Sequence, residues 1–133
     1  MRWFSYMNYD ACIKKSIEYI ENNLNKKIQL KELADKAFLS KYHFHRVFHS
    51  VVGEPVAEYI RKKRLEEAAN ELLTTENKII DIALKYQFSN QESFTKAFKR
   101  LYGIPPKEFR KNKINLTTIH SRKNSTTYLS MAA

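Results

Sequence analysis

Residues 40–59, SKYHFHRVFHSVVGEPVAEY, and residues 89–109, SNQESFTKAFKRLYGIPPKEF, carry the same pattern of aromatic, glycine and proline positions. A Leu-Ala pair at 33–34 and an Ile-Ala pair at 82–83 precede the two stretches. The copies are offset by 49 residues before the turn and by 50 after it, so the second turn has one extra residue. Each copy predicts a short helix, a tight turn and a second helix. Two copies indicate duplicated modules, because a solenoid needs three or more repeats.

The composition narrows the class of protein. A chain of 133 residues forms one ordinary domain or two very small ones. The formal net charge of +10 favours a polyanionic partner, with nucleic acid first, an anionic membrane surface second and a ribosomal role also compatible. The single cysteine, Cys12, excludes an internal disulfide and fits a reducing compartment. No stretch reaches the roughly 20 apolar residues of a membrane span. We therefore expect a soluble, cytoplasmic protein that does not act at a membrane.

The spacing of apolar residues, mostly three and four, predicts an all-α fold with two helix-turn-helix subdomains joined by a long helix. We place the first subdomain at 8–54, the linker helix at 55–74 and the second subdomain at 75–112. Residues 113–133 are expected to be a disordered tail or the start of a missing segment. The predicted helices run from 8 or 10 to 24, from 30 to 37, from Ser40 to Gly53, from Pro55 to 73, from 79 to 86, from the end of a turn at 88–90 to about 101, and from Pro105 onward.

In the second helix of each copy, apolar residues at helical spacing predict a buried stripe, at 44, 47, 48 and 51 in the first copy and at 94, 97, 98 and 101 in the second. Between these apolar positions, each helix carries a polar face suited to base edges. Arginine pairs with guanine through two hydrogen bonds, glutamine pairs with adenine, and glutamate accepts from the cytosine amino group. These pairings predict base reading by Arg46, Gln91 and Glu92, while Tyr42 and Lys96 can contact a thymine methyl. Phosphate contacts position a protein without reading sequence. We assign them to Lys41, His49, Thr95, Lys99, Arg100 and Arg110.

Other functions have weaker support. His45 and His49 share a helix face at a spacing that can hold zinc, but no third ligand is evident, so we predict no metal site and no cofactor. With two glycines the chain has no phosphate cradle, and we predict no enzyme activity. The alternative that stays open is a helical module that binds a protein partner and has a non-specific basic surface. The basic run 61–64 alternates with acidic residues, which favours a structural role first and phosphate contact second.

The chain resembles the AraC/XylS family of bacterial transcription regulators over about Ile13 to Lys111. The resemblance is carried by Leu33-Ala34, by 40–48 (SKYHFHRVF), Gly53 and 59–65 (YIRKKRL), and by Ile82-Ala83, Phe88, 91–94 (QESF), Phe98-Lys99, Gly103, Pro105-Pro106 and Phe109-Arg110. It implies seven helices and two DNA-reading subdomains on adjacent segments of the major groove. By position, it implies base reading by Tyr42, His45, Arg46, Gln91, Glu92 and Lys96.

The expected function is therefore sequence-specific binding to double-stranded DNA by a transcription regulator, which we expect to be an activator, with two recognition helices in successive major grooves. The linker helix would be roughly 27 Å long and would hold the two readers near one DNA turn, about 34 Å, apart. We expect a monomer on DNA, RNA polymerase as a partner, and an effector domain that is absent from this chain.

Overall fold

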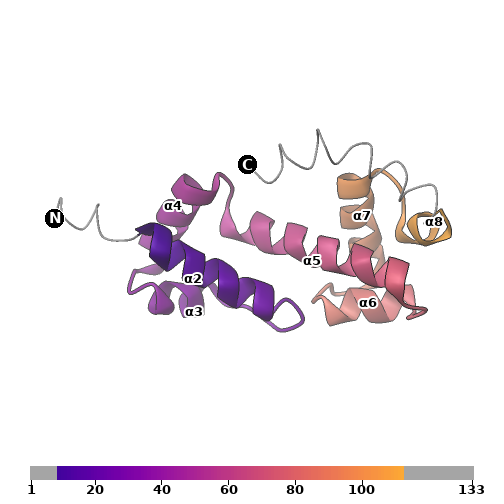
Figure 1. Ribbon diagram of the computed structural model, residues 1–133, viewed down its shortest axis with the longest axis horizontal. Coiled ribbons are helices and arrows are strands. Elements are labelled where there is room, and N and C mark those ends of the chain that lie inside the picture. The colour runs from indigo at the N-terminus through magenta and orange to yellow at the C-terminus, as the bar shows by residue number, and fades with distance from the viewer. Residues whose placement is uncertain (1–8, 113–133) are drawn as a thin grey trace. The chain divides into compact units, whose positions relative to one another are not determined.

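Over residues 9–112, which the computed structural model describes, the chain forms seven helices and no strand (Figure 1). They are α2 (Tyr9–Asn22), α3 (Leu30–Lys36), α4 (Lys41–Val52), α5 (Val56–Thr74), α6 (Ile79–Lys85), α7 (Gln91–Tyr102) and α8 (Pro106–Lys111). The predicted all-α fold is thus confirmed. The expectation of a disordered tail at 113–133 lies outside the described residues.

The chain divides into two compact units. Unit 1 is Met1–Glu67 together with Lys85–Gln87, and unit 2 is Ala68–Leu84 together with Phe88–Ala133. Unit 1 therefore contains α2, α3 and α4, and unit 2 contains α7 and α8. The division falls inside α5, after Glu67, so this helix contributes residues to both units.

Unit 1 has its core where α2, α3 and α4 contact one another. Apolar side chains at helical spacing supply this core, because they put a continuous apolar stripe on one side of each helix. Those at most 1% exposed are Ile13, Ile20, Leu33, Ala34, Phe44 and Phe48. The predicted buried stripe of α4 holds at Phe44, Val47 and Phe48 but is wrong at Val51, which is 44% exposed. Val51 lies in the last turn of α4, next to its final residue.

Unit 2 is built around aromatic rings. Phe94 and Phe98 of α7 are fully buried, with ring centroids 5.7 Å apart, and Phe98 meets Phe109 of α8 edge to face at 5.1 Å. Such tilted and edge-to-face pairs stabilise the core beyond what the burial of apolar area alone contributes. The stripe predicted on α7 also included 97 and 101, and these positions are only half-buried.

The turn inside each helix-turn-helix has the same backbone geometry. Phe38 and Gln87 adopt left-handed conformations, at φ 57° and 70°, immediately after the last turn of α3 and α6. Leu39 N–H donates to the Ala34 carbonyl at 2.9 Å, and Phe88 N–H donates to the Ala83 carbonyl at 3.0 Å. These bonds, which run back five residues, are those of a Schellman helix end.

The extra residue of the second copy lies between its left-handed residue and its N-cap. Phe38 and Gln87 are 49 residues apart, whereas the N-caps Ser40 and Asn90 are 50 residues apart. The predicted single insertion is therefore confirmed, and Ser89 precedes the cap rather than forming it.

Two helix boundaries differ from the prediction. Helix α2 ends at Asn22, two residues before the buried Leu24. Helix α5 begins at Val56, so Pro55 lies just before the helix rather than in its first turn. The Pro55 carbonyl accepts the first helical hydrogen bond, from Tyr59 N–H at 3.0 Å.

Candidate nucleic-acid interface

Helix α4 presents the first group of predicted DNA-reading residues. Ser40 caps its N-terminus, because the Ser40 hydroxyl accepts from the His43 N–H at 3.1 Å. Phe44 and Phe48 turn one side of α4 into the core, which leaves the other side open to solvent. The predicted residues on α4 are exposed, except for His45, which is half-buried: Lys41, Tyr42, His45, Arg46 and His49.

Two of these side chains are already arranged together. The Arg46 guanidinium carbon lies 5.7 Å from the centroid of the Tyr42 ring, one helical turn away. Tyr42 is itself 71% exposed, so the stacked pair projects into solvent. A shallow hollow beside it is lined by His45, Arg46, His49 and Ser50. The arrangement offers donors and one aromatic face to an outside ligand.

Helix α7 presents the second group. Its N-cap is Asn90, whose side-chain oxygen accepts from the Ser93 N–H at 2.8 Å. The predicted residues Gln91, Glu92, Lys96, Lys99 and Arg100 are exposed, and Thr95 is half-buried. Lys96 Nζ lies 3.3 Å from Glu92 Oε1, so two predicted base-reading residues form an ion pair one turn apart. Both are more than 70% exposed, and such a pair adds little stability that would oppose its opening on DNA.

Arg110 differs from the other predicted phosphate contacts. Its Nε donates to the Leu72 carbonyl at 3.1 Å and its Nη2 to the Thr75 carbonyl at 3.2 Å. The side chain therefore fastens α8 to the C-terminal end of α5 within unit 2. It is half-buried, whereas Lys41, His49, Lys99 and Arg100 are exposed.

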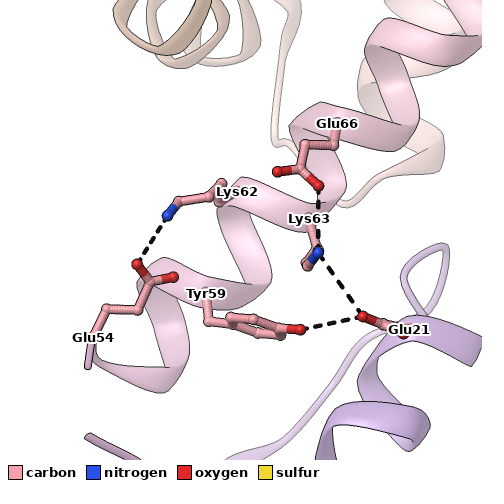
Figure 2. Close-up of polar contacts among 6 residues, drawn as sticks. All are labelled: Glu21, Glu54, Tyr59, Lys62, Lys63 and Glu66. Carbon is pink, nitrogen blue, oxygen red and sulfur yellow. Dashed lines mark hydrogen bonds and ion pairs between the residues drawn. The ribbon is translucent and has the colours of Figure 1, made fainter. Parts of the chain in front are cut away.

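The four cations of the basic run 61–64 contact carboxylates or backbone carbonyls inside unit 1. Figure 2 shows Lys62 paired with Glu54, and Lys63 placed between Glu21 and Glu66. The nitrogen–oxygen distances are 3.6 Å for Arg61–Glu58, 2.9 Å for Lys62–Glu54, 3.9 Å for Lys63–Glu21 and 3.5 Å for Lys63–Glu66. Arg64 donates to the Leu24 and Lys26 carbonyls at 3.0 and 2.8 Å. The structural role predicted for this run is confirmed.

Tyr59 lies in the same network. Its ring meets Phe48 edge to face at 5.6 Å, and its hydroxyl donates to Glu21 Oε1 at 3.2 Å (Figure 2). Burial of the phenol raises its pKa well above the ordinary value, and the negative charge of Glu21 raises it further. The neutral phenol thus joins α5 to α2.

The histidines do not form a metal centre with carboxylates or Cys12 within residues 9–112, where no group of three such ligands converges. His43 has a partner within the fold, since its Nε2 lies 3.3 Å from the Tyr9 hydroxyl. None of the seven helices in this range is long and apolar enough to cross a membrane.

Sequence reasoning missed the contacts of Arg64, Arg110 and Tyr9. The partners of the two arginines are backbone carbonyls 35 to 40 residues away, which carry no side-chain signature. The Tyr9–His43 contact joins residues 34 positions apart and likewise has no periodic signal.

A family model described as a helix-turn-helix domain matches residues 33–112. The chain is 46% identical over 104 residues to the uncharacterized HTH-type transcriptional regulator YbfP of Bacillus subtilis, a match that covers 78% of this chain and 35% of YbfP. It is 47% identical over 100 residues to the HTH-type transcriptional activator AarP of Providencia stuartii, covering 75% of this chain and 74% of AarP.

The fold is also similar to that of a solved protein. The DNA-binding domain of AdpA, determined in complex with a target DNA, matches with a TM-score of 0.69 and 20% identity. The match covers 84% of this chain and 95% of the AdpA chain. At this identity the likeness concerns the fold. The chain spans about a third of YbfP but three quarters of AarP, so its relatives differ in what lies beyond the shared region.

Proposed function

The chain belongs to the AraC/XylS family of helix-turn-helix transcription regulators, and on that premise we propose that α4 and α7 each enter a major groove of one specific DNA site. The family consists of DNA-binding regulators and is not a class of enzymes. The observation that carries the proposal is the matched pair of capped helices, each with an aromatic core side and an exposed polar side. A major groove admits one α-helix, and two successive grooves on one face of the duplex admit two.

In unit 1 we assign Arg46 to guanine, with Tyr42 and His45 beside it on the base edges. Support comes from the Arg46–Tyr42 stack, which limits the positions that the guanidinium can take before DNA arrives. Less rotamer freedom is then lost on binding. Lys41 and His49 are the phosphate contacts proposed for this helix.

In unit 2 we assign Gln91 to adenine and Glu92 to the cytosine amino group, with Lys96 as the third base-reading residue. The ion pair between Lys96 and Glu92 supports a joint role, because one groove position would engage both side chains. We assign phosphate contacts to Thr95, Lys99 and Arg100. Arg110 stays in this set only through its three remaining N–H donors, two on Nη1 and one on Nη2, since Nε and Nη2 each donate one hydrogen bond to a carbonyl.

We further propose that the protein activates transcription as a monomer on DNA, with RNA polymerase as its partner, in the cytoplasm where bacterial DNA lies. The name of AarP, a transcriptional activator of which the matched region covers 74%, supports activation. Both readers lie in one chain, so one molecule suffices for a two-part site. An effector domain outside the shared region, as the length of YbfP permits, is compatible with this proposal.

The decisive experiment is selection of bound duplexes from a random library, followed by affinity measurements on the selected and random duplexes at several salt concentrations. We expect an asymmetric site with two blocks about ten base pairs apart, bound at least about a thousandfold more tightly than random DNA. Uniform and steeply salt-dependent binding would instead favour the protein-interaction module with a non-specific basic surface.

A further inference from the structure

Phe38 is the most exposed of the large hydrophobic side chains in the described part of the chain, with 93% of its surface open to solvent. It also has a left-handed backbone, at φ 57°. A bulky residue is rarely found there, because its Cβ crowds the following carbonyl. The position is the one that glycine ordinarily fills at a Schellman helix end.

Folding alone does not account for a phenylalanine at this position. The chain has two glycines, and both end recognition helices, at Gly53 and Gly103, with φ of 92° and 84°. The ring of Phe38 is too exposed to compensate for the backbone strain by packing. Strain that persists without local compensation is often associated with function.

The matched residue of the second copy is used differently. Gln87 has the same left-handed backbone, but its amide donates to the Asn25 carbonyl at 3.1 Å and more weakly to the Lys85 carbonyl at 3.4 Å. Its side chain therefore takes part in the fold, whereas the Phe38 ring faces outward. The difference points to an external partner for Phe38.

Position in the sequence indicates which partner. Phe38 lies two residues before the N-cap Ser40, and the exposed Tyr42 follows in the first turn of α4. In helix-turn-helix proteins the N-terminal residues of the recognition helix contact base edges, so the preceding turn lies close to the groove. We propose that Phe38 is a nonpolar DNA contact that packs on a thymine C5 methyl or on deoxyribose carbons beside the bases read by α4. This inference rests on the proposed function.

The test uses F38N and F38G, which both tolerate a left-handed backbone, and F38Y, which keeps an aromatic ring. L84N is the matched control, because Leu84 is another exposed large hydrophobic residue, at 51%, outside the recognition helices. We would measure the melting temperature and the affinity for the selected duplex at several salt concentrations. We expect F38N to melt at or above the wild-type temperature yet bind about fivefold more weakly, the loss of one nonpolar contact.

F38G should weaken binding similarly, whereas F38Y and L84N should bind like the wild type. The salt dependence should not change, because a nonpolar contact releases no counterions.

Replacing thymine by uracil in the α4 half-site removes the methyl groups. If this lowers wild-type affinity without lowering that of F38N, the thymine methyl is the contact. An equal loss for F38N on both duplexes identifies the deoxyribose.

If F38N and F38G bind the selected duplex with wild-type affinity, the proposed contact between Phe38 and DNA is wrong. A clear fall in the melting temperature of F38N would also contradict the proposal. These results are distinct from failure of the proposed function, in which the wild-type protein itself prefers no duplex. The Phe38 contact alone fails if the wild type is selective and F38N is equally selective and tight.

Discussion

At the scale of single residues, Arg46 provides the sharpest test of base reading. Arg46→Ala removes a cation and a fork of donors, so we expect the affinity for the selected duplex to fall by at least about tenfold, within the 1–3 kcal/mol of a good bidentate contact. Affinity for random DNA should fall less. Arg46→Lys keeps the charge and loses the fork, so it should restore random binding but not specific binding. Equal losses on both duplexes would remove Arg46 from the base-reading set.

Variants of Arg110 and Lys99 distinguish a cation that stabilises the fold from one that contacts phosphate. Arg110→Ala deletes the hydrogen bonds to the Leu72 and Thr75 carbonyls, so the free energy of unfolding should fall by about 1–3 kcal/mol. Lys99 is exposed, and Lys99→Ala should leave stability unchanged while lowering the salt slope of DNA binding by about one. Urea denaturation and salt titrations measure both quantities. An Arg110→Ala variant of unchanged stability would contradict the anchoring role.

Single residues also mark the limit of what the sequence predicts. The exposed face of Tyr42, Arg46 and Gln91 follows from helical periodicity, because Phe44, Phe48 and their counterparts fix the buried side. The left-handed backbone of Phe38 does not follow, since the residue type opposes it and only the surrounding helix end imposes it. The hydrogen bonds of Arg64 and Arg110 do not follow from the sequence either, because tertiary packing selects their carbonyl partners.

At the scale of helices, Tyr59 joins α5 to α2 through the hydrogen bond that its neutral phenol donates to Glu21. Burial raises the pKa of this phenol in the folded state. Below the ordinary pKa of 10.0, the phenol is protonated in both folded and unfolded chains, so its stabilising effect is complete. Above that pH the unfolded phenol loses its proton while the folded phenol keeps it. Stability must therefore fall as pH rises.

Tyr59→Phe should lower the free energy of unfolding by about 1 kcal/mol at about pH 8, through loss of the bond to Glu21. The gap to the wild type should shrink at about pH 11, because the variant no longer has the alkaline penalty. Urea denaturation at both pH values measures this. Tyr42→Phe, at an exposed position, controls for the loss of one tyrosine and should keep the wild-type pH dependence. A constant gap between Tyr59→Phe and the wild type would contradict the shift.

Helix boundaries illustrate why sequence reading succeeded for most elements. Ser40 and Gly53 bracket α4 because a hydroxyl satisfies an N-terminal N–H and a glycine adopts the left-handed end. The same logic applies to α7, where the extra residue places Asn90 rather than Ser89 at the cap. Val51 was misassigned because periodicity continues to the helix end, whereas the covering core does not.

At the scale of the whole molecule, one group of cations makes contacts within the fold, and another group lies exposed on the two recognition helices. The four cations at 61–64 pair with carboxylates or carbonyls, so the net charge of +10 does not measure a free basic patch on α5. Exposed cations remain on both recognition helices, at Lys41 and Arg46 and at Lys99 and Arg100. We therefore expect the salt dependence of DNA binding to report mainly on α4 and α7.

Continuity of the chain through α5 leads to the last prediction. If each unit reads one block of a site, the first unit to bind holds the second at high local concentration, and the affinity of the pair exceeds that of either alone by about 10² or more. Inserting about five base pairs between the blocks turns the second groove to the opposite face of the duplex. Affinity should then fall about a hundredfold, to that of a duplex carrying only one block. Titration of both duplexes measures this, and binding that tolerates the insertion would mean that one unit does the reading.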